Sequence, residues 1–241
     1  MTVDRILHAA GKEPKKPQTT PHELTPAQQK QRVDCCNENL HNSHPRKLLL
    51  SIIAQDEKYV HYNNPAHNPV WVDADSPAPT RSKREIHSKK ILLSFWFSRH
   101  GVVHWDLLPE NTTMTAETLI HSLPTVKAKA AQLSPWLANP ILLWDNARPH
   151  KAKSIQEALM QQGFTTIPHP AYSPDLSPCD YHAFRSLQDF CDGKDFKTQD
   201  EVKSAIQQWI ETRPASFWSD GIEQLPERWQ NVVNNNGLYL V

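Results

Sequence analysis

One stretch, residues 140–184, constrains the fold more than any other part of this 241-residue chain. An apolar run at 141–144 has the character of a buried strand and ends at Asp145. A helical pattern over about 150–162 follows, with a glycine placed to end it, and then a second strand candidate at 164–167. Strand, helix and strand in this order predict an α/β fold, with a sheet flanked by helices.

A proline-rich segment then leads from Pro168 to Asp180, where the next helix is expected to begin. Each proline fixes its own φ and keeps the residue before it extended, so this loop is predicted to be rigid. A rigid loop suits the placement of Asp180 opposite the carboxylate of Asp145. Asp180 also follows Ser177 by three residues, so a helix-capping role is the structural alternative for it.

The rest of the chain places strands early and helices late, which one mixed domain explains. Apolar or alternating runs predict strands at 48–54, 58–62, 91–97 and 102–107, with Asp56 near the turn between the first two. Helices are expected at 25–39 with Thr25 as N-cap, and at 115–133 with a break at Pro124. Two more are expected at 198–212, where Thr198 and Glu201 form a capping box, and around 225–233. Residues 1–30 are expected to form an N-terminal arm or linker, and residues 31–241 the α/β domain.

Charge and cysteine usage exclude several classes of protein. The net charge is zero, so any nucleic-acid contact has to come from local patches rather than from a global field. The four cysteines include no CxxC pair and no secretory framework, which disfavours a zinc site or a disulfide scaffold. Without a signal peptide or an apolar run of about 18 residues, the chain is expected to be intracellular and soluble, with no membrane partner.

A long irregular segment at 64–90 interrupts the pattern of strands and helices. Such an excursion inside a compact domain is uncommon and often functional. It carries a basic run that includes Arg81, Lys83 and Arg84. This run either lies in a solvated loop or binds the phosphate backbone of a nucleic acid.

Three aspartates at predicted element ends, Asp56, Asp145 and Asp180, are the candidate catalytic residues. Carboxylates gathered by a sheet can bind two divalent cations, which stabilise a phosphodiester displacement, and a cluster of acids without His or Cys suits magnesium. The structural alternatives are a solvated turn for Asp56, an ordinary Asp-Asn turn for Asp145 and the helix cap for Asp180. Arg148 and His150 follow Asp145 and are candidates for phosphate contact, with helix capping or a surface salt bridge as the alternative.

Two blocks of this sequence resemble the signature blocks of mariner-family transposases: WDNARPH at 144–150 and HPAYSPDLSPCDYHAF at 169–184. The 34 residues that separate Asp145 from Asp180 equal the spacing in that family. QDEKYVHYNNP, from Gln55, resembles the first catalytic block of the family. PHELT, from Pro21, resembles its interdomain linker, and RWQNVVNNNGLYL, from Arg228, resembles its carboxyl end, so the similarity covers about 20–240.

The resemblance implies an RNase H-like fold of the retroviral integrase and transposase superfamily, in which the three aspartates hold two Mg²⁺ ions, with Mn²⁺ able to substitute. It further implies cleavage of double-stranded DNA at transposon terminal repeats, strand transfer into TA targets, a homodimer and a nuclear location. The segment at about 73–90 corresponds to the family's clamp loop, which reaches the partner subunit. The linker residues His22 and Glu23 correspond to dimer contacts.

This sequence departs from the family pattern at its start. Family members carry paired helix-turn-helix domains before the linker, whereas PHELT begins here at Pro21 and is preceded by Thr19-Thr20 instead of Trp-Val. The resemblance therefore implies a catalytic domain that lacks the DNA-binding module. The alternatives are a catalytically inactive remnant that binds DNA or protein or dimerises, which retention of all three aspartates disfavours, and a generic nuclease acting on RNA–DNA hybrids, which the family blocks disfavour.

Overall fold

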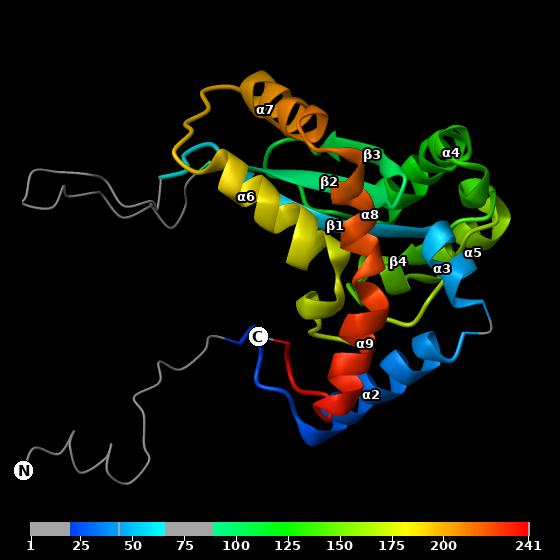
Figure 1. The fold of residues 1–241 in the computed structure, drawn as a ribbon. Coiled ribbons are helices and arrows are strands. Elements are labelled where there is room, and N and C mark those ends of the chain that lie inside the picture. The colour runs from blue at the N-terminus through cyan, green and yellow to red at the C-terminus, as the bar shows by residue number, and fades with distance from the viewer. Residues whose placement is uncertain (1–19, 43, 66–88, 241) are drawn as a thin grey trace, which may run out of the picture.

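The structure, a computed structural model, describes residues 20–42, 44–65 and 89–240. Within these residues a five-stranded sheet has the order β3-β2-β1-β4-β5, and helices cover both of its faces (Figure 1). β1 (Ile52–His61) pairs antiparallel with β2 (Lys90–Ser98), which pairs antiparallel with β3 (Gly101–Leu107). β4 (Ile141–Leu143) and β5 (Thr165–Thr166) extend the sheet in parallel. The predicted mixed α/β sheet is confirmed.

The predicted strand at 48–54 is confirmed only for residues 52–54, and the predicted turn at Asp56 is wrong. Residues Pro45–Ser51 form the short helix α3, and β1 then passes through Asp56 without a turn, with Asp56 opposite Phe95 of β2. Pro45 occupies the first turn of α3, where its fixed φ favours a helix. A short apolar run does not distinguish a buried strand from a buried helix turn by itself, so only the pairing of β1 decided the boundary.

Two hydrophobic clusters lie on the two faces of the sheet, which explains why β2 is a continuous apolar run. Phe95 and Phe97 of β2 face one side, where they contact Trp218. Trp96, between them, faces the other side and packs in the cluster that includes Leu123. Successive strand residues point to opposite faces, so a strand buried on both faces shows no alternation in its sequence.

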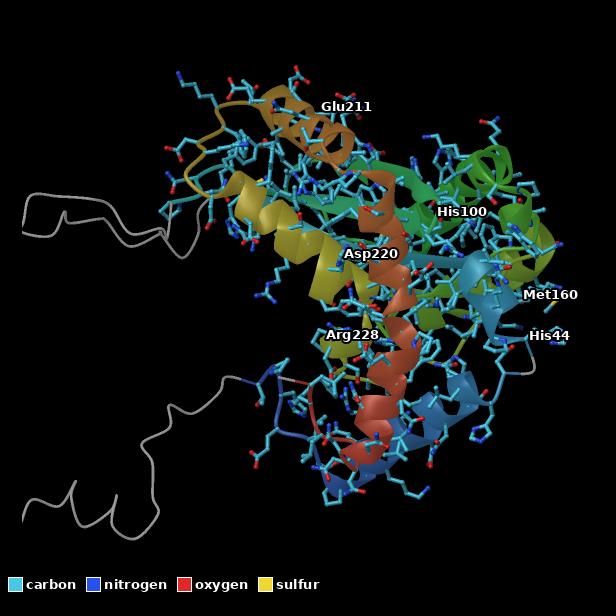
Figure 2. The ribbon with its side chains drawn as sticks, viewed as in Figure 1. His44, His100, Met160, Glu211, Asp220 and Arg228 are labelled. Atoms are coloured by element: carbon cyan, nitrogen blue, oxygen red, sulfur yellow. The ribbon has the colours of Figure 1, made fainter. Side chains whose placement is uncertain are left out.

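The helices of the two layers come from different parts of the chain. α4 (Ala116–Leu133) and α5 (Lys153–Gln162) supply the cluster around Trp96. The other cluster is covered by α6 (Arg185–Cys191), α7 (Gln199–Glu211), α8 (Ala215–Glu223) and α9 (Leu225–Asn234). Side chains that project from these helices into solvent include Glu211 on α7 and Asp220 on α8 (Figure 2).

The predicted break at Pro124 does not occur, because α4 continues through it. Proline has no N–H for the carbonyl of Ile120 and usually breaks a helix. Here Leu119, Leu123 and Val126 are fully buried on one face of α4, while Pro124 itself is exposed. Packing of the apolar face therefore outweighs the local cost of the proline.

Helix ends were predicted better than helix interiors. Thr25 caps α2 (Pro26–Leu40), and Gly163 ends α5 in the left-handed conformation, with a φ of 69°. Thr198 caps α7 as predicted, but the Glu201 carboxylate accepts from the Lys197 N–H rather than from Thr198. α8 was not predicted at all.

α2 crosses to the carboxyl-terminal end of the domain and packs against α9 (Figure 1). The division of the chain at residue 30 stays a prediction. Arg81, Lys83, Arg84 and all but the last two residues of the predicted clamp loop lie outside the described residues. In the part of the chain that the structure describes, no helix combines the length and apolarity needed to cross a membrane.

Candidate active site

Three different elements bring the predicted aspartates to one cavity. Asp56 lies within β1, and Asp145 follows β4 by two residues. Because Ala54 pairs with Leu143 in the parallel ladder, Asp56 and Asp145, each two residues further on, lie at the same level. Asp180 lies in the single π-helical turn η4 (Cys179–Phe184). All three line one cavity of about 580 Å³.

Asp56 and Asp180 form a coupled pair of carboxyl groups. Both side chains are partly buried and line the cavity. Burial raises the pKa of Asp56 well above its ordinary value, and the charge of Asp180 raises it further. Burial also raises the pKa of Asp180. Two partly buried carboxylates at one cavity repel each other when both are ionised, and a bound cation would compensate that charge.

Asp145 is held by a different set of contacts. Its Oδ1 accepts hydrogen bonds from the Ala147 N–H at 2.8 Å and from His150 Nδ1 at 2.7 Å. Burial acts to raise the pKa of Asp145, but the bonds from His150 and Ala147 outweigh it and lower that pKa. Asp145 is therefore ionised, and its side chain remains 48% exposed toward the cavity.

His150 connects Asp145 to a fourth acid, Glu57. Its Nε2 lies 3.7 Å from Glu57 Oε1, and its ring stacks on Trp144 with centroids 4.5 Å apart. Burial acts to lower the pKa of His150, but the hydrogen bond to Asp145 and the negative charges of Glu57 and Asp145 raise it to about 9. His150 is thus an imidazolium with only 2% of its side chain exposed. Its predicted contact with DNA stays a prediction, whereas its contact with Asp145 is a role the sequence did not indicate.

The donor chemistry of the cavity suits a hard divalent cation. Asp56, Asp145 and Asp180 offer carboxylate oxygens, which Mg²⁺ and Mn²⁺ prefer. Among the described residues, however, no three His, Cys, Asp or Glu side chains converge tightly enough to hold a metal as they stand. Asp145 Oδ1 instead accepts hydrogen bonds from His150 and Ala147, and Asp56 Oδ1 accepts one from the Glu57 N–H. Coordination therefore requires these carboxylates to exchange their protein partners for the cation.

Basic residues line the same cavity or lie close to its aspartates in the sequence. Arg148, predicted as a DNA contact, lines it and is exposed, as is Lys151. Lys58 lies two residues after Asp56 and is half-buried; burial lowers the pKa of Lys58, although Asp180 opposes the shift. The period of two along β1 places Lys58 on the same face as Asp56, a signal that the sequence contained.

His169 is a further cavity residue that sequence reasoning did not single out. Burial lowers the pKa of His169 to about 4, so the ring is neutral at physiological pH. Its carbonyl accepts a hydrogen bond from Asn146 Nδ2, which joins the segment after β4 to the proline-rich loop.

Of the predicted linker residues, His22 reaches the rim of this cavity. Its ring stacks on Tyr172, with centroids 4.2 Å apart, and Tyr172 lines the cavity. Glu23 is exposed. Their contribution to a dimer stays a prediction.

Comparisons with known proteins show what the chain is similar to. Residues 61–137 match the family described as "Transposase (partial DDE domain)". The chain is 36% identical over 241 residues to the human histone-lysine N-methyltransferase SETMAR and 31% identical over 242 residues to the Mariner Mos1 transposase of Drosophila mauritiana. Both comparisons cover 99% of this chain, but the chain spans only 35% of the human protein and 70% of the Drosophila protein.

Solved structures give the same result at the level of the fold. The crystal structures of the Mos1 paired-end complex with Mn and with Mg each match with a TM-score of 0.90, at 30% and 31% identity. They cover 99% and 98% of this chain, and 71% and 70% of the Mos1 chain. The RNase H-like fold is confirmed.

Proposed function

The chain belongs to the mariner family of transposases, and from that premise we propose that it is a catalytic domain that cuts DNA at transposon ends and transfers the cut strand to a target. The observation that carries this proposal is the cavity at which Asp56, Asp145 and Asp180 meet. Each aspartate comes from a different one of the three sequence blocks that resemble the family's catalytic motifs.

Divalent cations are the proposed cofactors, supported by the Mn and Mg named for the Mos1 complexes. Asp56, Asp145 and Asp180 would hold two such ions. When bound, a pair of divalent ions lowers the pKa of an attacking water and neutralises the charge that develops on the phosphate. The oxygen-only donor set supports Mg²⁺ or Mn²⁺ over zinc.

The other residues of the cavity have proposed roles in orientation and charge. Asp56 and Asp180 would be ionised in the cation-bound protein. His150, which lies beside Glu57, would orient the Asp145 carboxylate. Arg148 and Lys151, which are exposed at the cavity, contact the DNA phosphates and fix the register of the strand without reading its sequence.

The proposed partners are double-stranded DNA and a second copy of the chain. The paired-end complexes of Mos1, which match the chain over nearly its whole length, support both. TA target sites, terminal-repeat substrates and a nuclear location are carried over from the family resemblance. Dimer contacts through His22, Glu23 and the 73–90 segment belong to the same proposal.

Nicking of supercoiled plasmid at low salt tests the proposal. Metal-dependent nicking is expected from the unaltered chain with Mn²⁺ or Mg²⁺, and we expect Asp145→Asn to abolish it. Asp106→Asn is the matched control, because Asp106 is an exposed aspartate on β3 that does not line the cavity. Equal nicking by Asp145→Asn and the control would refute the assignment of the site. Preferential cleavage of an RNA–DNA hybrid would favour a generic nuclease instead.

A further inference from the structure

The buried face of α2 is polar, which is unusual for a helix packed on a domain. Arg32 and Cys36 are fully buried and Asn39 is 4% exposed. Their spacing of four and three residues places them on one face of the helix. A helix normally turns apolar residues inward, and a fully buried Arg is rare unless it is paired. The hydrogen bonds made by this polar face therefore indicate the structural role of α2.

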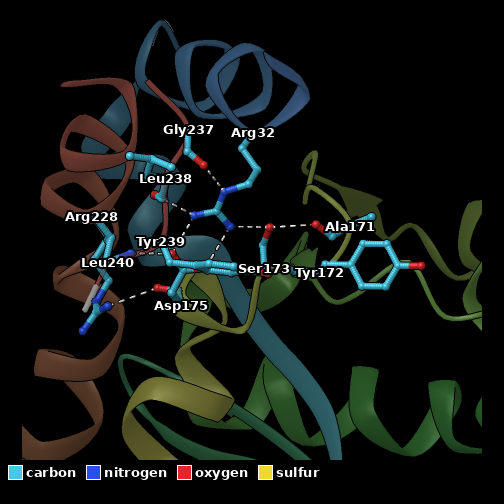
Figure 3. A network of polar contacts seen from close by, with 10 residues as sticks. All are labelled: Arg32, Ala171, Tyr172, Ser173, Asp175, Arg228, Gly237, Leu238, Tyr239 and Leu240. Atoms are coloured by element: carbon cyan, nitrogen blue, oxygen red, sulfur yellow. Dashed lines mark hydrogen bonds and ion pairs between the residues drawn. The ribbon is translucent and has the colours of Figure 1, made fainter. Parts of the chain in front are cut away.

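Arg32 uses its whole guanidinium group (Figure 3). Its two terminal nitrogens donate to both carboxylate oxygens of Asp175, at 2.9 and 2.6 Å, and one of them also donates to Ser173 Oγ at 2.6 Å. Nε donates to the Gly237 carbonyl at 2.9 Å, and a terminal nitrogen donates to the Leu238 carbonyl at 3.3 Å. One side chain thus joins α2, the proline-rich loop and the carboxyl-terminal segment.

The carboxyl-terminal segment is bound to the same loop by contacts of its own. The Leu240 N–H donates to Asp175 Oδ2 at 3.1 Å, and Tyr239 Oη donates to the Tyr172 carbonyl at 2.8 Å (Figure 3). Arg228 of α9 donates to the Asp175 carbonyl at 3.1 Å. Asp175 is therefore held from three directions.

α2 grips the loop at a second point. Asn39 Nδ2 donates to the Pro168 carbonyl at 3.0 Å. The loop between Pro168 and Asp175 is thus tied to one face of α2 at both of its ends. His169 and Tyr172, which lie between these two ties, line the cavity of the three aspartates.

From Asp175 the chain reaches Asp180 through a short and stiff path. The 3-10 turn η3 (Pro174–Leu176) and Pro178 restrict the backbone, and Leu176 and Cys179 are buried almost completely. The Asp180 N–H then donates to Ser177 Oγ at 3.4 Å. Because this backbone is restricted, a displacement of Asp175 is expected to displace Asp180 as well.

We propose that Arg32 is a positioning residue for the active site: by holding the 168–175 loop between α2 and the carboxyl-terminal segment, it sets the position of Asp180 for divalent cations. This inference rests on the proposed function for its chemical consequence. Lysine cannot replace Arg32, because an ammonium lacks the planar fork that binds a carboxylate at two points. A buried ion pair is seldom a net source of stability, which is consistent with a role in fixing geometry.

Two variants disturb this network without touching the three aspartates. Arg32→Lys keeps the charge opposite Asp175 but removes the fork. Gly237→Ala leaves Arg32 intact, but its Cβ would lie 2.3 Å from the Gln29 carbonyl oxygen, so it forces the carboxyl-terminal segment away from α2. Gly163→Ala is the matched control, because its φ is also positive, at 69°, while its Cβ meets only Lys127 Nζ, at 3.5 Å.

The first measurement is hydrogen exchange in the full chain, followed on peptides that cover residues 169–184. Exchange in these peptides is expected to accelerate at least tenfold in Arg32→Lys and Gly237→Ala, and to stay unchanged in Gly163→Ala. Unchanged exchange in both network variants would overturn the coupling.

The second measurement is Mn²⁺ affinity, titrated well below the melting temperature with near-UV circular dichroism confirming the fold. Both network variants are expected to bind Mn²⁺ about tenfold more weakly than the control, the loss typical of residues that orient metal ligands. Faster exchange with unchanged Mn²⁺ affinity would mean that Arg32 only stabilises the loop, and the positioning role would be rejected. Asp56→Asn distinguishes failure of this inference from failure of the proposed function. If Asp56→Asn binds Mn²⁺ as tightly as the unaltered chain, the proposed function fails. The exchange data then still decide whether Arg32 is coupled to the loop.

Discussion

At the scale of single residues, the candidate site is arranged at the expense of stability. Asp56 and Asp180 are two carboxyl groups whose burial raises both pKa values, and the fully buried His150 Nε2 has no hydrogen-bond partner among the described residues. Buried acids of this kind are common at functional sites, where ligand binding compensates their cost.

The first prediction concerns the metal-free protein at about pH 8. Asp56→Asn removes one of the two coupled carboxylates, so we expect the free energy of unfolding to rise by about 1 kcal/mol. Added Mn²⁺ should raise the melting temperature of the unaltered chain but not of this variant. Thermal denaturation with and without Mn²⁺ measures both effects, with Asp106→Asn as the control. A loss of stability in metal-free Asp56→Asn would contradict the prediction.

The second prediction concerns acid stability and His169. Because the folded-state pKa is about 4 and the ordinary value 6.5, the neutral ring stabilises the fold above pH 6.5, and this contribution is lost as the pH falls from 6.5 to 4. The loss is at most about 3 kcal/mol. Urea unfolding of His169→Asn between pH 7 and pH 4 should lack this part of the pH dependence. Identical pH profiles for the two proteins would show that His169 is not the titrating group. The raised pKa values of Asp56, Asp180 and His150 act in the opposite sense and are common to both proteins.

At the scale of elements, local sequence signals predicted where helices begin and end. They did not predict whether a helix continues through an unfavourable residue. Thr25, Thr198 and Gly163 have the predicted capping roles because a cap is decided by a few neighbouring residues. Pro124 was expected to break α4, and the buried Leu119, Leu123 and Val126 keep the helix intact instead. α2 shows the converse case, since its buried face carries Arg32 and Asn39 and gives no apolar stripe to detect.

The third prediction therefore concerns α4. Pro124→Ala should stabilise the protein by about 2 kcal/mol, because it restores an N–H for the Ile120 carbonyl at an exposed position. This corresponds to a rise of several degrees in melting temperature for a chain of this length. Thr125→Ala, at the neighbouring exposed position, should change stability by less than about 0.5 kcal/mol. If the two variants melt at the same temperature, the proline is not a source of strain in α4.

At the scale of the whole molecule, the chain has 26 basic and 26 acidic residues, so its net charge does not attract DNA. Affinity for DNA must therefore come from local basic groups. Arg148 and Lys151 are two such groups, and both are exposed at the cavity. Each phosphate contact contributes about 0.9 to the slope of log affinity against log salt concentration.

The fourth prediction follows from this charge distribution. Arg148→Ala should weaken binding to duplex DNA uniformly across sequences and reduce the salt slope by about one. Lys203→Ala, an exposed lysine on α7, should leave the slope unchanged. Fluorescence anisotropy at several salt concentrations gives both slopes. An equal slope for the unaltered chain and Arg148→Ala would remove Arg148 from the DNA contacts. Neutralising Arg81, Lys83 and Arg84 together should lower the slope further.

The sequence by itself determined the fold class and the three candidate aspartates, because the apolar runs before Asp145, the stiff prolines before Asp180 and the family blocks are all local patterns. It did not determine that β1 runs straight through Asp56, that His150 is buried against Asp145 and Glu57, or that Arg32 meets Asp175 and Gly237. Each of these depends on residues far apart in the chain, such as Arg32 and Gly237, which are 205 positions apart. Pairing across a sheet and burial of a charge are decided by which segments meet, and only the tertiary structure specifies that.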